Sequence, residues 1–147
     1  MHLATANAAT ILTSYEDPSM ADFVAQLDDV NASADVAEGF VWRLIEDEAD
    51  AAEIARIFAS DRTLFNMSVW ESVETLRAWV YSGQHLAVVQ RRAEWFEKST
   101  RSPLVLWWIE EGHIPTIAEA KQRFDMLWDN GPTTDAFTFA TRFEALR

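Results

Sequence analysis

The sequence predicts an α+β fold: a ferredoxin-like split β-α-β antiparallel sheet with an extra C-terminal helix. Two observations support this class. Short apolar or alternating stretches are separated by longer stretches whose apolar residues recur at helical spacing. They follow the order strand, helix, strand, strand, helix pair, strand, helix, and the first six parts match the split β-α-β motif. With 147 residues and no linker or repeat, we expect one domain over residues 1–147.

The first half of the chain supplies three of the four expected strands. Residues 2–9 alternate small alanines with other side chains, as a strand beneath a closely packed helix would. Asp17 and Pro18 suit the N-cap and first turn of a helix that ends within residues 31–35. Strands are then expected over residues 40–45 and 63–70. The segment between them begins with an acidic turn at 46–50, and its remainder, 51–58, is compatible with either a short helix or an irregular edge.

The second half supplies the helix pair, the fourth strand and the extra helix. Ser72 is a candidate cap for a helix over 73–81, and Ser82-Gly83 separates it from a longer helix over 84–98. The fully apolar stretch 104–109 predicts a buried strand. Thr116 and Glu119 have capping-box spacing at the start of the last helix, which Asn130-Gly131-Pro132 ends. Residues 136–143 are a possible added edge strand.

Composition excludes several classes of function. A net charge of −12 argues against nucleic acid, which is bound by basic residues, and against anionic membrane surfaces. The chain has no cysteine, and neither a metal-ligand motif nor a nucleotide-binding glycine loop, so we expect no metal. We find no signal peptide and no apolar run of membrane-spanning length, and therefore expect a cytoplasmic protein.

The third strand indicates where a site lies. Phe65, Met67 and Val69 point to one side, whereas Asn66, Ser68 and Trp70 point to the other. We expect helices to cover the apolar side, and the polar side to be bare until a second copy of the chain buries it. This predicts a homodimer.

Other polar residues join the same polar face in this scheme. Asn7 lies on it in the first strand, and Arg43 joins it if Trp42 faces the helices. Buried amides and guanidinium groups are costly unless they are hydrogen-bonded. The cluster therefore indicates either a hydrogen-bonded interface or a cavity for a small ligand.

Four further residues are candidates for that cavity. His85 begins the helix after the Ser82-Gly83 break and can act as an acid, a base or a ligand. Arg92 lies seven residues later on the same face, where it is available to a ligand or to surface acids. Trp107 and Trp108 face opposite sides of the fourth strand, so one of them can line the cavity, although the sequence does not say which.

Several segments together resemble a known bacterial family of unknown function. They are HLATANAA, GFVWRL, LFNMSVWESVETLRAWVY, HLAVVQRRAEWFEK and LVLWWIEEGHIPTIAEA. That family is similar to the dimeric α+β barrel superfamily, which includes antibiotic-biosynthesis and heme-degrading monooxygenases. The resemblance implies the fold already predicted from the element order.

The resemblance also implies roles for particular residues. Asn66 and Trp70 are similar to the Asn and Trp with which cofactor-free monooxygenases hold a phenol near oxygen. Asn7, Trp70 and His85 look like the Asn, Trp and His of heme-degrading relatives. In this chain, however, the interval from Trp70 to His85 is longer and contains the Ser82-Gly83 break.

Three functions follow. The favoured one is a cofactor-independent, monooxygenase-like enzyme, or a related isomerase or cyclase, acting on an aromatic or polyketide-type ligand. Asn66, Trp70 and His85 would be catalytic, with Asn7, Arg43, Ser68, Arg92, Trp107 and Trp108 binding the substrate. The alternatives are a heme-binding or heme-degrading protein that uses His85, and a module that binds a ligand without catalysis.

Overall fold

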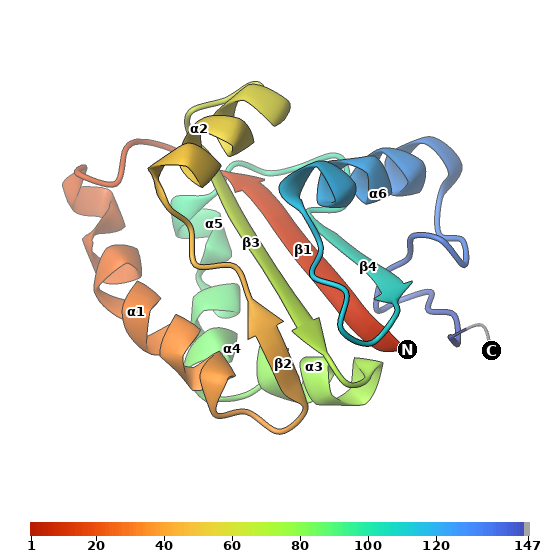
Figure 1. Cartoon of the computed structure of the whole chain (residues 1–147). Coiled ribbons are helices and arrows are strands. Elements are labelled where there is room, and N and C mark those ends of the chain that lie inside the picture. Colours follow the sequence, from red (N-terminus) through yellow and green to blue (C-terminus); the bar gives the residue numbers. More distant parts are fainter. Residues whose placement is uncertain (146–147) are drawn as a thin grey trace.

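The computed structural model describes residues 1–145, in which four antiparallel strands form one sheet of order β2-β3-β1-β4 (Figure 1). The strands are β1 (His2–Thr10), β2 (Phe40–Arg43), β3 (Thr63–Trp70) and β4 (Leu104–Ile109). β1 lies at the centre, between β3 and β4, and is antiparallel to both. The predicted ferredoxin-like α+β fold is confirmed.

The helices of the described residues are η1 (Pro18–Met20), α1 (Ala21–Asp35), α2 (Glu48–Ile57), α3 (Val73–Val80), α4 (Gly83–Gln90), α5 (Arg92–Trp95) and α6 (Ile117–Asn130). Side chains cap the first turns of η1, α2, α3 and α6. Asp17, Ser72 and Thr116 each accept a hydrogen bond from a backbone N–H of the first turn, as predicted. The segment 51–58, which the sequence left as either a short helix or an irregular edge, is mainly helical. The capping box of Asp47 and Asp50 starts α2 inside the acidic stretch.

Two predicted elements differ from the structure. The expected helix over 84–98 is divided into α4 and α5, which meet at Arg91. The expected edge strand over 136–143 is reduced to isolated bridges. Phe137 and Leu106 exchange backbone hydrogen bonds of 2.9 and 2.8 Å, and Ala136 pairs with Thr133. The fold therefore keeps four strands, and the extra C-terminal helix is α6.

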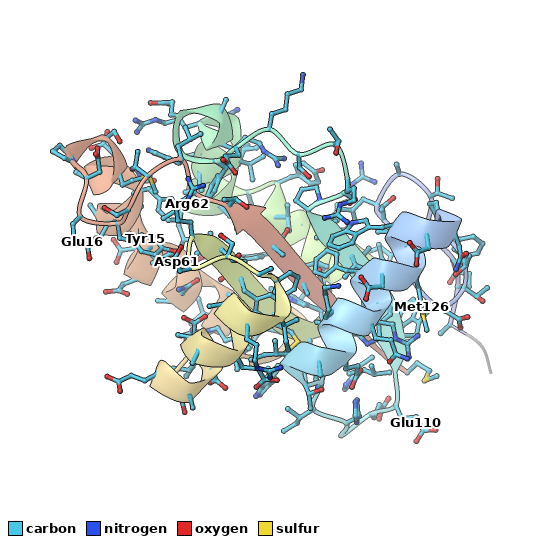
Figure 2. All side chains as sticks on the ribbon, turned by 90° about the horizontal axis from the view of Figure 1, so that it is seen from above. Tyr15, Glu16, Asp61, Arg62, Glu110 and Met126 are labelled. Carbon is cyan, nitrogen blue, oxygen red and sulfur yellow. The ribbon has the colours of Figure 1, made fainter. Side chains whose placement is uncertain are left out.

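Helices cover both faces of the sheet, so the prediction of a bare polar face is wrong. On the apolar face, α2 and α6 pack over Phe65, Met67 and Val69 (Figures 1 and 2). α1, α3, α4 and α5 lie on the other side, over the face that carries Asn66 and Ser68. Periodicity had shown that these helices bury one side, but not which face of the sheet each covers. The sheet needs no second copy to be buried, and the homodimer stays a prediction.

Candidate functional site

A cavity of about 280 Å³ lies between the polar face of the sheet and the helices α1, α3 and α4. Its sheet side carries Thr5 and Asn7 from β1, with Asn66 and Ser68 from β3. Its helical side is mostly apolar and includes Phe23, Leu27, Val30, Leu76, Val88 and Val89. The cavity therefore has one hydrogen-bonding wall and one hydrophobic wall.

The register of the two central strands gathers the polar side chains. Asn7 lies opposite Asn66, and Thr5 lies opposite Ser68. Since alternate residues share a face, these two cross-strand pairs are neighbours on the cavity wall. The sequence thus correctly predicted that Asn7, Asn66 and Ser68 come together.

Ser68 is oriented by the indole of Trp70. The Trp70 Nε1–H donates a 2.9 Å hydrogen bond to Ser68 Oγ, which leaves the hydroxyl hydrogen of Ser68 free to donate elsewhere. Trp70 is fully buried and does not line the cavity itself. The edge of Phe40 contacts it at a centroid distance of 5.5 Å, and Trp79 stacks on it at 5.4 Å. In this structure Trp70 supports the cavity wall.

Thr5 is the most enclosed polar group of this wall. Its side chain is 4% exposed, and Oγ1 has no hydrogen-bond partner among the described residues. A buried hydroxyl without a partner is unfavourable. Thr5 was not predicted as a site residue, although its position two residues before Asn7 places it on the same face.

His85 lines the cavity in one defined tautomer. Its Nδ1 lies 2.9 Å from the backbone oxygen of Val80, and because that oxygen can only accept, Nδ1 carries the proton and donates it. Nε2 is consequently an acceptor. Burial lowers the pKa of His85, partly offset by the hydrogen bond to Val80, so the imidazole is neutral near pH 7.

Trp79 holds the His85 ring and was not predicted from the sequence. The two ring centroids are 4.4 Å apart, and the Trp79 Nε1–H donates to Ser33 Oγ on α1 at 3.0 Å. The available signal was helical spacing: Trp79 follows the buried Leu76 by three residues and therefore lies on the inner side of α3.

The two predicted arginines both line the cavity, in different states. Arg43 lies on the polar face, which the sequence had left conditional on Trp42. The strand register shifts between Phe40 and Trp42, and Trp42 packs on the opposite face, under α2 and α6. The Arg43 guanidinium binds Asp35 at 2.7 and 3.2 Å and thereby lowers the pKa of that carboxyl group. Arg92 is exposed on α5 and has no carboxylate within salt-bridge distance among the described residues.

Neither Trp107 nor Trp108 lines this cavity. Trp107 is buried on the opposite face of the sheet, where its Nε1–H donates to Glu119 of α6 at 2.9 Å. Trp108 is on the same face as Trp70, but its Nε1–H donates to the backbone oxygen of Phe143 in the C-terminal segment. Both indoles are satisfied by the chain itself, so the structure does not bring them to the other site residues.

Among residues 1–145, no cluster of three or more His, Cys, Asp or Glu side chains has the spacing of a metal site. Within the same part of the chain, every helix is too short or too polar to traverse a bilayer.

Known structures share this fold at low sequence identity. A conserved protein from Methanosarcina mazei Go1 superposes with a TM-score of 0.53 at 11% identity, covering 75% of this chain and 94% of that chain. Rv0793 from Mycobacterium tuberculosis superposes with a TM-score of 0.53 at 15% identity, covering 77% of this chain and 100% of that chain. SnoaB, a cofactor-independent oxygenase from Streptomyces nogalater, superposes with a TM-score of 0.50 at 15% identity, covering 75% of this chain and 94% of that chain. Such identities establish a common fold and no more.

The family is established by the sequence. No curated protein matches the chain significantly. Residues 2–147 match a domain of unknown function, DUF3291, which spans almost the whole chain. The predicted membership in a family of unknown function is confirmed: the chain belongs to the DUF3291 family and shares the α+β fold of SnoaB.

Proposed function

We propose that this protein is a cofactor-independent, monooxygenase-like enzyme that acts on a small aromatic ligand. The observation that carries the proposal is a neutral imidazole with an unprotonated Nε2 in a cavity that has one polar wall and one apolar wall. The fold shared with SnoaB, which is described as a cofactor-independent oxygenase, gives secondary support. Asn66 and Ser68 would hold the oxygen of a phenol, and the apolar wall would hold its rings.

The reaction needs a substrate that can itself reduce oxygen. His85 Nε2 would take the proton of a phenol, and the amide N–H groups of Asn7 and Asn66 would stabilise the phenolate. The phenolate transfers an electron to O2, and the two radicals combine at the para carbon to give a peroxide anion. The imidazolium of His85 returns its proton to that anion, and the hydroperoxide loses water, which takes up the para C–H proton, to leave a quinone. For 1-naphthol, the sum is naphthol plus O2 giving 1,4-naphthoquinone plus water, without an external reductant.

Heme is the second candidate because the His85 tautomer is the one a histidine ligand adopts, with Nδ1–H bound to a carbonyl. The cavity volume argues against a ligand as large as heme. A cavity of roughly 150 Å³ holds one benzene ring, and 280 Å³ is less than twice that. A tetrapyrrole is far larger than this volume, which favours a smaller aromatic ligand over heme. We expect hemin to give no Soret shift that depends on His85.

Oxygen consumption with 1-naphthol tests the proposed function. We expect enzyme-dependent uptake, with one atom of ¹⁸O2 in the quinone and one in water. Asn66→Ala and His85→Gln should each lower kcat/KM at least about tenfold. Lys98→Gln is the control, since Lys98 is exposed and does not line the cavity.

Two results would contradict the proposal. Conversion of the ligand at the same rate without oxygen would indicate an isomerase or cyclase instead. Binding of 1-naphthol with no turnover above that of buffer would leave a module that only binds its ligand.

A further inference from the structure

The cavity differs in charge from the rest of the chain. Of the 147 residues, 24 are Asp or Glu and 12 are Lys or Arg, which gives a net charge of −12. Among the described residues, however, no Asp or Glu lines the cavity, whereas Arg43 and Arg92 both do. A strongly acidic protein has here a cavity without carboxylates, which favours anions over cations.

The two arginines are not equally available to a ligand. Arg43 is engaged by Asp35, which leaves little of its charge uncompensated. The neighbouring Arg91 is likewise engaged, by Glu94 and Asp22. Arg92 has no such partner among the described residues, and the neutral His85 does not compete with it for an anion. Arg92 is exposed, so it lies where the cavity opens to solvent.

A second polar group of the cavity is the buried hydroxyl of Thr5. Thr5 is 4% exposed, lines the cavity, and offers a hydroxyl that no described residue binds. Its strand neighbours in register are Ser68 and Leu106. The Ser68 oxygen accepts from Trp70, and neither neighbour forms a hydrogen bond with the Thr5 hydroxyl. A ligand oxygen at Thr5 would supply the hydrogen-bond partner that its buried hydroxyl lacks.

We propose that the cavity binds an aromatic carboxylate of one or two rings, with its carboxylate at Arg92 and a hydroxyl or carbonyl oxygen at Thr5. The inference deepens the proposed function, since it rests on the same cavity receiving an aromatic ligand. The volume of 280 Å³ sets the size limit. The exposed Arg92 and the buried Thr5 set the order of the two polar groups along the ligand.

Calorimetric titration with two matched probes tests whether the cavity prefers a negatively charged ligand. The probes are 6-hydroxy-2-naphthoate and its neutral amide, 6-hydroxy-2-naphthamide, which carry their polar groups at opposite ends of two rings. We expect the carboxylate to bind about twofold to fivefold more tightly at low salt. The preference should shrink in 0.5 M NaCl (about a 4 Å Debye length), because an exposed ion pair is screened.

Variants assign the two contacts. Arg92→Gln should abolish the preference for the carboxylate, whereas Lys98→Gln, which removes an exposed charge away from the cavity, should keep it. Thr5→Val should weaken the binding of both probes about threefold to tenfold. It should also leave the midpoint of thermal unfolding unchanged or raise it, because the hydroxyl has no partner in the chain. A purely structural Thr5 would lower that midpoint instead.

The outcomes separate this inference from the proposed function. Equal affinity for the two probes, or a preference for the carboxylate that survives Arg92→Gln, overturns the proposal of an anionic ligand even if oxygen uptake is observed. An Arg92-dependent preference for the carboxylate supports the inference even if no oxygen is consumed, in which case the oxygenase proposal alone fails. If neither probe binds, the inference is wrong, and oxygen uptake with 1-naphthol alone decides the proposed function.

Discussion

The indole of Trp79 lies over the imidazole of His85, with ring centroids 4.4 Å apart and planes tilted by 53°. The same indole stacks on Trp70 at 5.4 Å. Trp79 therefore connects the buried aromatic residue behind the cavity wall to the titratable group that lines it. Since burial is the largest cause of the lowered pKa of His85, the residue that covers the ring should control that pKa.

Replacing Trp79 should raise the pKa of His85. In Trp79→Leu, water reaches the imidazole, and we expect its pKa to move toward the ordinary value of about 6.5. An NMR titration of the imidazole C–H signals measures it directly. Ser33→Ala is the matched control, because it removes the hydrogen bond to the Trp79 indole but keeps the ring in place. An equal change in both variants would contradict the covering role of the indole.

The lowered pKa of His85 should also appear as a dependence of stability on pH. In the unfolded chain the imidazole takes up a proton near pH 6.5, whereas in the folded chain it does so only at lower pH. Between these values the unfolded state binds more protons, so the free energy of unfolding falls as pH falls. This contribution is fully present above pH 6.5.

Urea unfolding at about pH 7.5 and pH 5.5 measures that contribution. The wild type should lose more stability on acidification than His85→Gln, since only the wild type carries this linkage. Carboxylates titrate in both proteins and cancel in the comparison. An identical loss in the two proteins would mean that burial does not perturb His85.

Sequence reasoning predicted the wall of the site better than its cover. Strand alternation is local, so the shared face of Asn7, Asn66 and Ser68 followed from the order of the residues and an antiparallel sheet. Which helices cover that face is a tertiary question. The apolar stripes of α1 and α6 both indicate one buried side, and nothing local tells the two faces of the sheet apart.

The misplaced tryptophans have the same origin. One of Trp107 and Trp108 was expected in the cavity because they face opposite sides of the fourth strand. The structure instead satisfies Trp107 through Glu119, twelve residues later, and Trp108 through the backbone of Phe143. These partners depend on where α6 and the C-terminal segment pack, and strand periodicity carries no information on that.

The hydrogen bond between Trp70 and Ser68 should contribute measurably to stability. Ser68→Ala leaves a fully buried indole N–H without its acceptor, and we expect a loss of about 1–3 kcal/mol in the free energy of unfolding. Asn66→Ala is a matched control on the same strand, since Asn66 is exposed. It should change stability by less than about 0.5 kcal/mol. Equal losses in urea unfolding would mean that the bond contributes nothing specific.

The turn before β2 should be coupled to the site through α3. Gly39 has φ of +80°, and a Cβ there would lie 2.5 Å from the side chain of Thr75. Thr75 forms the capping box of α3 with Ser72, and α3 carries Trp79. Gly39→Ala therefore meets a steric conflict at the start of the helix that positions the indole, in addition to the cost of the positive φ.

Gly112 allows the two costs to be separated. Its φ is +89°, but a Cβ there would meet nothing within 4 Å. We expect Gly112→Ala to lower the free energy of unfolding by about 1–2 kcal/mol, and Gly39→Ala to lower it by more. Only Gly39→Ala should also raise the pKa of His85 in the NMR titration, because only it displaces the helix bearing Trp79. Equal destabilisation of the two variants, with the pKa of His85 unmoved in both, would contradict a link from this turn to the cavity.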